Sequence, residues 1–595
     1  MAKPRLTKEE YLANFRQNGR NVVGTYIKGK GESFIIPDDD KLPQSIDVLS
    51  ITDRGQTVIS STISGLKVVA SFADTEELKV NIIEILGVAT KVGTDVLSIL
   101  RSHNLDADFP NDVLHEADRV AKISKAEIER REDLRKKFII TIDPADAKDL
   151  DDAVSLETNP DGTHELGVHI ADVSQYIVEG GALDEEAFNR GTSVYFPGGV
   201  IPMLPVKLSN HICSLEANQD RLALSCFMTI DRQGRVTKSR ISETVINVNQ
   251  RFSYLEAQDI LDGKTQASKQ VTEFLKSMKD LTKTIEHTRR VRGEVTLNIP
   301  EPKIVLDETT GKIIDVVAYP HLMAHRIVET FMILANETIA QWALDHSLPF
   351  MYRIHEKPDP VKVARLVEML KPFAIQHTIR ENPTGHDYQR LLKNASEDLK
   401  PIISQLALRS MQKAKYSPEC LGHFGLGSKY YCHFTSPIRR LPDLIIHRII
   451  KYMLNCKLSS HKLVEFGDFV QKASAQAIKT ELTATEVERE VDNLKRAEYM
   501  SERIGEQFSG TISGITEFGV FVYLANTVEG LVKIENMPKE GREFYRYNER
   551  TGTLSSNRRT FKMGDKIEVT CIAVNMSRRQ IEFAAVQPET QPAKV

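Results

Sequence analysis

Hydrophobic positions alternate with polar ones in short runs at both ends of the chain, whereas they follow a helical period through much of the middle. Near the N-terminus, "NVVGTYIKGKGESFIIPDDD" places two apolar runs around a glycine-containing turn, and "GLKVVASF" and "VNIIEILG" continue the pattern. This pattern predicts a small β-barrel over residues 20–90, preceded by an N-terminal extension at residues 1–19.

The next segment changes to a helical period. Apolar residues at three- and four-residue spacing predict helices over residues 91–137, which would link the barrel to a large domain at residues 138–500. That domain begins with strand-like runs such as "KFIITID" and "RLALSCFMTID" and continues with helical segments such as "MAHRIVETFMILANETIAQWAL". A sheet beside a layer of helices is typical of an α+β domain.

Strand patterning returns in the last part of the chain. "FSGTISGITEFGVFVYL", "TVEGLVKIENM" and "GDKIEVTCIAVNMSRRQIEFAAV" are short runs separated by glycine turns. They predict an OB-type barrel over residues 506–587, followed by a polar, disordered tail at residues 588–595. The predicted fold class is therefore α+β multidomain, with a central domain flanked by OB-type β-barrels.

Composition narrows the class of protein. With 595 residues the chain is too long for a single core, and its 41% hydrophobic content is ordinary for a globular protein. We find no apolar run long enough for a bilayer, no secretory signal and no CxxC pair, so we expect a cytoplasmic protein without membrane contact. The net charge of -4 argues weakly against a simple polyanion binder, although local basic patches decide nucleic-acid binding.

One short stretch crowds acidic residues together. In "TIDPADAKDLDDAV", Asp143, Asp149, Asp151 and Asp152 follow an apolar strand. Carboxylates so close together repel one another unless they are protonated or bind a cation. Oxygen ligands without Cys or His suit Mg²⁺ or Mn²⁺ better than zinc, and the spacing is not that of an EF-hand. An acidic surface loop is the alternative, and the apolar "AVSL" directly after the cluster argues against it.

A second stretch offers cations. In "HFTSPIRRLPDLIIHR", Arg439 and Arg440 lie between Pro437 and Pro442, in a segment that opens a helix. Arginine suits bidentate contact with phosphate. Solvated arginines at a helix start would give the same pattern, so this stretch alone leaves both interpretations open.

The motifs in combination are specific. "TIDPADAKDLDDAV", "VHIADVSQYI", "RGTSVYFPGGVIPMLP", "GHFGLGSKYYCHFTSPIRRLPDLIIHR" and "GTISGITEFGVFV" occur in this order. Over about residues 85–587 the chain resembles the RNase II/RNase R family of 3′-to-5′ exoribonucleases, and it is closer to the RNase R branch. The resemblance implies a cold-shock-like barrel, a central RNB domain and an S1-type barrel.

The resemblance also implies an activity. We expect processive hydrolysis of single-stranded RNA from its 3′ end to 5′-nucleoside monophosphates, in RNA turnover and processing. Magnesium would be the cofactor, with manganese able to substitute. A monomer is expected, with association with RNA-decay or ribosomal machinery as one further partner.

Carried over residue by residue, the four aspartates match the family's catalytic cluster. Asp149 and Asp152 would be the main direct magnesium ligands, with Asp143 beside them, and Asp151 would be the aspartate most needed for the chemical step. Arg439 matches the arginine that holds the scissile phosphate.

The resemblance places further residues along the RNA. Tyr195 in "TSVYFP" would pack against the 3′-terminal nucleotide, and Glu488 would lie near that nucleotide, with Glu486 as the alternative. Arg440 and Arg353 would line the RNA path. We expect His169 and Asp172 to be structural or to support the catalytic residues indirectly, and we expect Trp342, on a helix, to belong to the core.

The chain departs from the family at several positions. Ile304 stands where the family has an aromatic residue opposite the tyrosine, so the clamp on the RNA end would be weaker. The N-terminal barrel region is short, which leaves Phe34 and Tyr26 as possible stacking residues. In the C-terminal barrel, Phe518 and Phe521 match the aromatic RNA-binding face, and we expect Phe518 to face RNA.

Two other functions compete with the exoribonuclease. A catalytically inactive RNA-binding scaffold could keep the same shell, although it would be expected to lose an aspartate or Arg439. An endonuclease or a DNA nuclease could share the same metal chemistry, and a circular substrate separates it from an enzyme that needs a free end.

Overall fold

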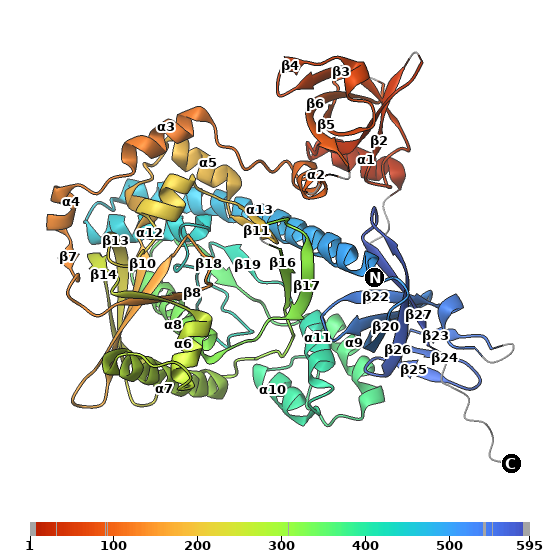
Figure 1. Ribbon diagram of the computed structural model, residues 1–595. Helices are drawn as coiled ribbons and strands as arrows, with labels where there is room; N and C mark the ends of the chain where they lie inside the picture. The colour runs from red at the N-terminus through yellow and green to blue at the C-terminus, as the bar shows by residue number, and fades with distance from the viewer. Residues whose placement is uncertain are drawn as a thin grey trace.

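The computed structural model consists of a central domain with one β-barrel before it in sequence and another after it (Figure 1). It describes residues 7–30, 32–75, 77–89, 91, 93–307, 309–539, 543–549 and 551–586. Residues 1–6 of the predicted extension and the predicted tail at 588–595 lie outside the described residues. Across these ranges, no helix combines the length and the apolar character needed to cross a membrane.

The N-terminal barrel follows helix α1 (Lys8–Gln17). Its strands are β1 (Val22–Lys28), β2 (Ser33–Pro37), β3 (Ile46–Asp53), β5 (Leu66–Phe72) and β6 (Lys79–Val88), with the short β4 (Gln56–Thr57) added at one edge. The sheet closes because β2 pairs with both β1 and β3. Tyr26 is fully buried in this core and its hydroxyl donates to Ser33, so the prediction of a stacking role for Tyr26 is wrong. Phe34 is half-exposed.

Three short helices connect this barrel to the central domain, as the apolar spacing predicted. They are α2 (Thr94–Ser102), α3 (Asn111–Val120) and α4 (Lys125–Arg130). Helix α3 packs against α5 (Ala182–Arg190) on the central domain, which fixes the path of the linker.

The central domain contains a seven-stranded sheet with the strand order β15-β8-β9-β10-β13-β14-β7. Its strands are β7 (Glu132–Asp133), β8 (Ile140–Asp143), β9 (Asp152–Thr158), β10 (His164–Ala171), β13 (Asp220–Ile230), β14 (Val236–Asn247) and β15 (Gln250–Ser253). Strands β10 and β13 are buried along almost their whole length, since helix α8 (Met323–Asp345) packs on both. The interior of this domain forms the largest buried cluster of the chain as described.

Helices and short hairpins surround the sheet. The remaining helices of the domain are α6 (Tyr254–Leu261), α7 (Lys269–Arg292), α9 (Pro360–Leu370), α10 (Gly385–Asn394), α11 (Lys400–Ser410) and α12 (Leu441–Leu454). Three hairpins pair β11 (Val194–Phe196) with β12 (Gly199–Ile201), β16 (Pro302–Leu306) with β17 (Ile313–Ala318), and β18 (Tyr352–Ile354) with β19 (Lys415–Ser417).

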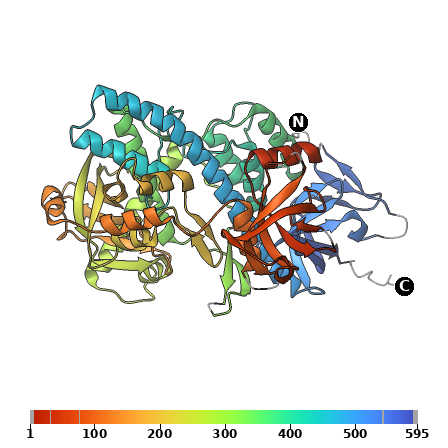
Figure 2. The same ribbon diagram turned by 90° about the horizontal axis from the view of Figure 1, so that it is seen from above.

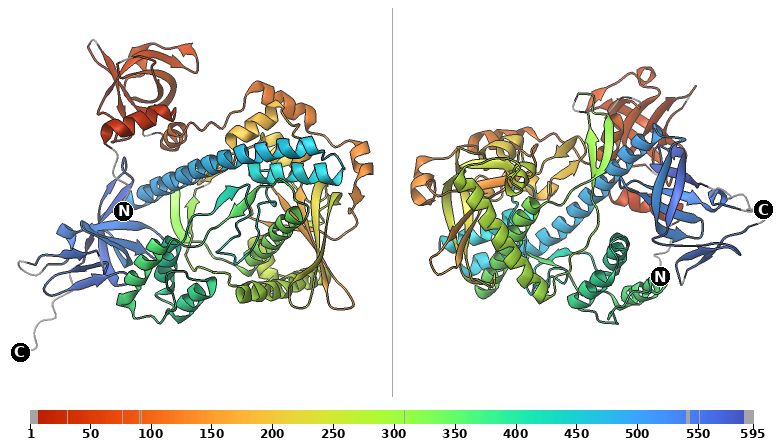
Figure 3. Two further views of the ribbon diagram at one scale, coloured as in Figure 1. Left: turned by 180° about the vertical axis from the view of Figure 1, so that it is seen from behind. Right: turned by 60° about the horizontal axis from the view of Figure 1, so that its bottom comes forward.

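One long helix supports several of these parts. Helix α13 (Ser460–Ser501) has 42 residues and runs diagonally from the central domain to the C-terminal barrel (Figure 3). It contacts α2, α5, α12, β11, β17, β19 and β26 along its length. Because strand β11 packs against it, the helix also fixes the position of the β11 residues for which the sequence predicts contact with the 3′ end of the RNA.

The C-terminal barrel closes from five strands: β20 (Gln507–Thr516), β21 (Gly519–Leu524), β22 (Glu529–Lys533), β26 (Lys566–Asn575) and β27 (Gln580–Ala585). Both barrels lie at the same end of the molecule (Figure 2), and Arg578 of one forms an ion pair with Asp40 of the other at 3.0 Å. The predicted α+β fold with flanking barrels is therefore confirmed.

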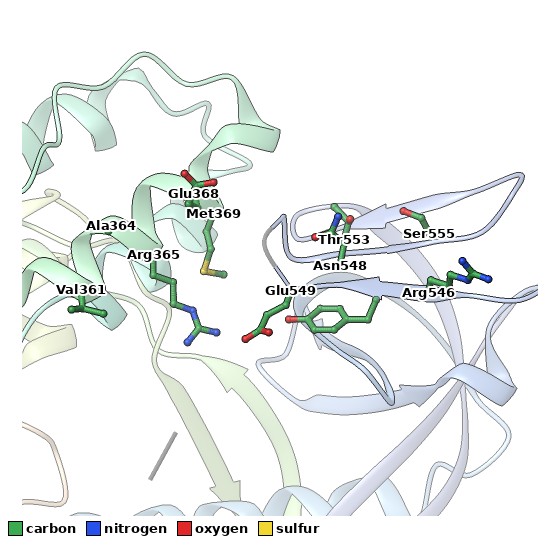
Figure 4. Close-up of a pocket in the computed structure, with 11 residues that line it drawn as sticks. Val361, Ala364, Arg365, Glu368, Met369, Arg546, Asn548, Glu549, Thr553 and Ser555 are labelled. Carbon is green, nitrogen blue, oxygen red and sulfur yellow. The ribbon is translucent and has the colours of Figure 1, made fainter. Parts of the chain in front are cut away.

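A separate three-stranded sheet of β23 (Arg546–Asn548), β24 (Thr553–Ser555) and β25 (Thr560–Lys562) extends from this barrel. A cleft of about 1010 Å³ separates the sheet from helix α9, and Arg365 of the helix points across it toward Glu549 (Figure 4).

Candidate active site

The carboxylate cluster lies in the loop that joins two neighbouring strands of the central sheet. Asp143 ends β8 and Asp152 begins β9, so the intervening loop folds back over one end of the sheet. The loop is held there by the backbone amide of Ala171, which donates to the carbonyl of Asp151 at 2.9 Å. The amide of Leu150 also donates, to the hydroxyl of Ser214 at 3.1 Å.

Asp151 is buried and only partly satisfied. Its side chain is 4% exposed, and Oδ1 accepts a hydrogen bond from the backbone amide of Ile438 at 2.9 Å. Oδ2 has no hydrogen-bond partner among the described residues, and the Nε atom of Arg439 lies 3.9 Å away from it. Burial raises the pKa of Asp151 well above its ordinary value, although Arg439 and the Ile438 amide oppose that shift.

Asp143 and Asp152 are two further carboxylates whose pKa values are raised by burial. Burial, followed by the charge of Asp152, raises the pKa of Asp143, and the Oδ2 atom of Asp143 also has no partner in the part of the chain described. Burial raises the pKa of Asp152 to about 6 against the opposing charges of Arg439 and Arg440. The site therefore holds two buried carboxylate oxygens without donors, which is the environment that a divalent cation relieves.

The protein alone does not complete a ligand set. Within the described ranges, no three His, Cys, Asp or Glu side chains are gathered closely enough to hold a metal by themselves. Hard oxygen donors still fit magnesium, which is commonly held by one or two carboxylates together with water and substrate phosphate.

Tyr195 closes one side of the cluster. It lies on β11, where its hydroxyl donates to Oδ2 of Asp149 and its backbone amide donates to Glu488 at 3.3 Å. Burial and the charge of Asp149 raise the pKa of Tyr195. Glu488 is half-buried on α13, whereas Glu486 is exposed, so of the two candidates only Glu488 is shown in contact with Tyr195.

The two arginines of "SPIRR" have different surroundings. Arg440 donates to Asp443 at 2.7 Å, and Asp443 also accepts from the backbone of Ser436 at 2.8 Å, so this arginine braces the segment. Within the described residues, the guanidinium of Arg439 donates one hydrogen bond, to the nearby Ser436 hydroxyl at 3.2 Å, and its side chain is 42% exposed next to Asp151. Arg439 is thus the arginine available to a phosphate.

Arg353 and Ile304 both contact other residues of this chain. Arg353 pairs with both oxygens of Glu481, at 2.7 and 2.8 Å, and its guanidinium lies 4.6 Å from the centre of the Tyr416 ring. Ile304 faces Val316 across the β16–β17 hairpin and packs against the core of the C-terminal barrel.

The C-terminal barrel presents an aromatic and basic face. Phe518 is 51% exposed and Phe521 is half-buried, with their rings 6.2 Å apart and close to perpendicular. They line a cavity of about 1050 Å³ together with the cations Arg496, Lys533 and Arg578 and the carboxylates Glu529 and Glu582. Stacking on Phe518 beside these cations suits single-stranded nucleic acid.

Sequence reasoning missed Arg251. Its guanidinium donates to the backbone carbonyls of Pro144, Ala145 and Ala147, at 3.1, 3.1 and 2.8 Å, and so holds the aspartate loop in place. It reaches the loop because β15 pairs in parallel with β8, and no local sequence signal announces that pairing.

Tyr254 was missed for the same reason. It follows β15 directly, and its ring stacks on His325 at 3.9 Å. Burial and the charges of Asp152 and Asp143 raise the pKa of Tyr254.

His169 and Asp172 have the structural surroundings that we expected. His169 is buried between the hydroxyls of Ser155 and Ser225, at 2.9 and 2.8 Å. Asp172 pairs with Arg131 and Lys451. Trp342, in contrast, is only half-buried at the edge of the core.

Family models match three segments of the chain. They are the cold shock domain at residues 34–110, the RNB domain at residues 131–455 and the S1 RNA binding domain at residues 502–585.

Curated relatives match nearly the whole chain. Ribonuclease R of Thermotoga maritima is 36% identical over 96% of this chain and 81% of its own length. Ribonuclease R 1 of Lactococcus lactis is 38% identical over 85% of this chain and 62% of its own length. The chain thus spans between about three fifths and four fifths of these two relatives.

Solved structures agree with these matches. RNase R of Mycoplasma genitalium in complex with ribose-methylated single-stranded RNA has a TM-score of 0.87 at 27% identity, covering 96% of this chain and 90% of that one. Yeast Ssd1, a pseudonuclease, has a TM-score of 0.70 at 19% identity, covering 90% of this chain and 67% of that one, and it shows the fold alone.

Proposed function

Since this chain belongs to the ribonuclease R family of exoribonucleases, we propose that it hydrolyses single-stranded RNA processively from the 3′ end. The products would be 5′-nucleoside monophosphates released one at a time. The observation that carries this proposal is the pairing of Asp151, buried with an unsatisfied oxygen, with Arg439 at 3.9 Å.

Asp143, Asp149, Asp151 and Asp152 are the residues that would hold a divalent metal. Ribonucleases of this family use such ions, and the oxygen donors here suit magnesium, with manganese as a substitute. A bound ion of this kind supplies activation of a water molecule and stabilisation of the leaving 3′-oxygen. RNA phosphate oxygens would complete the ligand set that the carboxylates begin.

The protein's own groups have separable roles in this proposal. Arg439 would contact the scissile phosphate and offset the charge that develops on its oxygens. Tyr195 would stack on the terminal nucleotide, while Glu488 holds the Tyr195 backbone in place. Arg440 would act indirectly, because its bond to Asp443 orients the segment that carries Arg439.

RNA binding is supported by the S1 match and by the RNA complexes of the M. genitalium enzyme. The exposed Phe518 face of the C-terminal barrel would guide single strands toward the central domain. The monomeric state, the cytoplasmic location and any association with RNA-decay or ribosomal machinery stay predictions.

The test uses purified protein, magnesium and single-stranded RNA labelled at its 5′ end. We expect a ladder that shortens from the 3′ end, mononucleotide products and no activity after chelation with EDTA, with RNA binding retained. A circular RNA of the same sequence should remain intact. Cleavage of the circle, or full activity after thorough chelation, would contradict the proposal.

A catalytically inactive scaffold is the second candidate, because a pseudonuclease shares this fold. The presence of all four aspartates and of Arg439 favours the enzyme. RNA binding without any mononucleotide release in magnesium or manganese would favour the scaffold.

A further inference from the structure

A further cavity, partly open to solvent, lies on the central domain, away from the carboxylates. It has a volume of about 320 Å³ and is bordered by the β13–β14 turn, the C-terminal half of α7 and the C-terminal half of α8. None of its lining residues belongs to the carboxylate site. His325 lies near that site and Trp342 lines the cavity, and the stretch of α8 between them spans roughly 25 Å at the usual helical rise.

Four cationic side chains line the cavity, and three of them are paired with carboxylates. Its lining includes Arg235, Lys238, Arg289 and Arg292 against Glu337 and Asp345. Arg292 is neutralised by Glu337, with Nη1 at 3.2 Å from the carboxylate, and Arg235 by Asp231 at 2.8 Å. Lys238 is exposed and forms no ion pair with any described residue.

Arg289 is the unusual member of this set. It is 5% exposed, and its Nη2 atom pairs with Glu294. Its Nε atom is buried without a hydrogen-bond partner in the part of the chain that the structure describes. A buried guanidinium N–H without an acceptor is unfavourable, and an anion that reaches it would supply the acceptor.

Two aromatic rings border the same space. Trp342 is half-buried, and its ring lies 4.6 Å from that of His346. The Tyr430 hydroxyl donates to Gln341 at 2.9 Å, which fixes the second ring. A planar group can stack on an indole, and the cationic side chains that line the same space can contact a phosphate.

We propose that this cavity binds a nucleoside 5′-monophosphate, with the base on Trp342 and the phosphate near Lys238 and Arg289. The volume suits one nucleotide. Asp345 and Glu337 disfavour a more highly charged triphosphate. Binding requires no catalysis, so it does not depend on the proposed function, although a product nucleotide would be one source of the ligand.

Trp342 provides the measurement, because it is the single tryptophan of the chain. Full-length protein is titrated with AMP or UMP in a chelator, so that no RNA is hydrolysed, and tryptophan fluorescence is followed. We expect a saturable change with either monophosphate, weaker binding of ATP, and much weaker binding of inorganic phosphate alone or of adenosine. No saturable change, tighter binding of ATP, or equal binding of adenosine would overturn the proposal.

Variants show whether the fluorescence change arises from nucleotide bound in this cavity. Lys238→Gln should weaken the affinity roughly tenfold, as loss of one charge-assisted contact to phosphate does. Lys269→Gln, an exposed lysine at the other end of α7, is the matched control and should leave it unchanged. In Trp342→Leu, calorimetry should show loss of binding. If Tyr195→Ala abolishes the fluorescence change while Lys238→Gln does not, the signal comes from the catalytic site and the proposal is wrong.

Discussion

Two buried aspartates lie side by side at one end of the central sheet, and the protein treats them in opposite ways. The backbone carbonyl of Asp151 accepts from the amide of Ala171, the residue just before Asp172. Asp172 accepts from Arg131 at 2.6 Å, from Lys451 at 2.9 Å and from Ser174 at 2.8 Å. Asp151 has one amide donor and a distant arginine.

Their acidities differ accordingly. Burial alone would raise both pKa values, but the charges of Lys451 and Arg131 hold the pKa of Asp172 below its ordinary value. The pKa of Asp151 stays raised, because Arg439 does not offset its burial. A buried carboxylate that the protein neutralises itself serves the fold, whereas one that it leaves unsatisfied is prepared for a ligand.

The largest expected effect is on catalysis. Asp151→Asn removes a charge needed at the metal site, so turnover of single-stranded RNA should fall by several orders of magnitude. RNA binding should be at least as tight, because a negative charge near the phosphates is lost. Single-turnover kinetics measure the turnover, and filter binding measures the RNA affinity. Near-wild-type turnover would contradict the catalytic role that distinguishes Asp151 from Asp172.

The matching change at the neighbouring residue should act on stability. Asp172→Asn removes the fully buried carboxylate that Arg131 and Lys451 share and leaves them only Glu127 and Glu243 among the described carboxylates, which should reduce the free energy of unfolding by about 3–5 kcal/mol. Urea denaturation followed by Trp342 fluorescence reports on the central domain. Asp151→Asn serves as the control and should not destabilise, since it removes a buried charge that Arg439 and the Ile438 amide only partly offset.

Bound metal should stabilise the folded protein through the carboxylate cluster and not through Asp172. Magnesium at a hundredfold excess over its Kd should raise the free energy of unfolding of the wild type by about 2.7 kcal/mol. The combined change Asp143→Asn and Asp152→Asn should remove this gain, whereas Asp172→Asn should keep it. Equal stabilisation of all three proteins would place the bound ion elsewhere.

A smaller effect is expected at the aromatic side of the carboxylate site. Stacking on Tyr195 should contribute about 1–3 kcal/mol per base, so Tyr195→Ala should leave longer limit products with little change in the early rate on long RNA. Ile304→Phe should leave the limit product unchanged, because Ile304 packs on the C-terminal barrel. Gel analysis of the terminal fragments measures both effects. Unchanged fragment lengths from Tyr195→Ala would show that Tyr195 does not contact the 3′-terminal nucleotide of the RNA.

The smallest effect concerns acid. The pKa of Asp172 is lowered in the folded protein, so its contribution to stability is complete above the unfolded value of about 3.9 and is lost as the pH falls below it. The difference in unfolding free energy between wild type and Asp172→Asn should therefore shrink from pH 5 to pH 3, by at most about 1.4 kcal/mol per pH unit. If the difference in unfolding free energy grows as the pH falls, the pKa of Asp172 is not lowered in the folded protein.

The sequence predicted the parts of this molecule that depend on local pattern. Alternating strands and glycine turns sufficed for the two barrels, and contiguous motifs sufficed to single out the aspartates and Arg439. Alternation along a strand did not decide which side faces inward, and so Tyr26 was misplaced although its strand was expected.

Long-range pairing was out of reach of such reasoning. Arg251 and Tyr254 come about a hundred residues after the aspartate loop and meet it only through the parallel pairing of β15 with β8. Likewise, the bond of Arg440 to Asp443 distinguishes it from Arg439, and the two look equivalent in sequence.

The hairpin that carries Ile304 has a consequence for cooperativity. Val316 on β17 is fully buried in the same cluster as Met500 of α13 and Val520 of the C-terminal barrel. The hairpin, the end of the long helix and the barrel should therefore unfold together, and slow amide hydrogen exchange should extend across all three. Deleting the barrel would leave Val316 and Met500 exposed to water, so a truncated chain reports on a damaged central domain as well as on a missing RNA-binding surface.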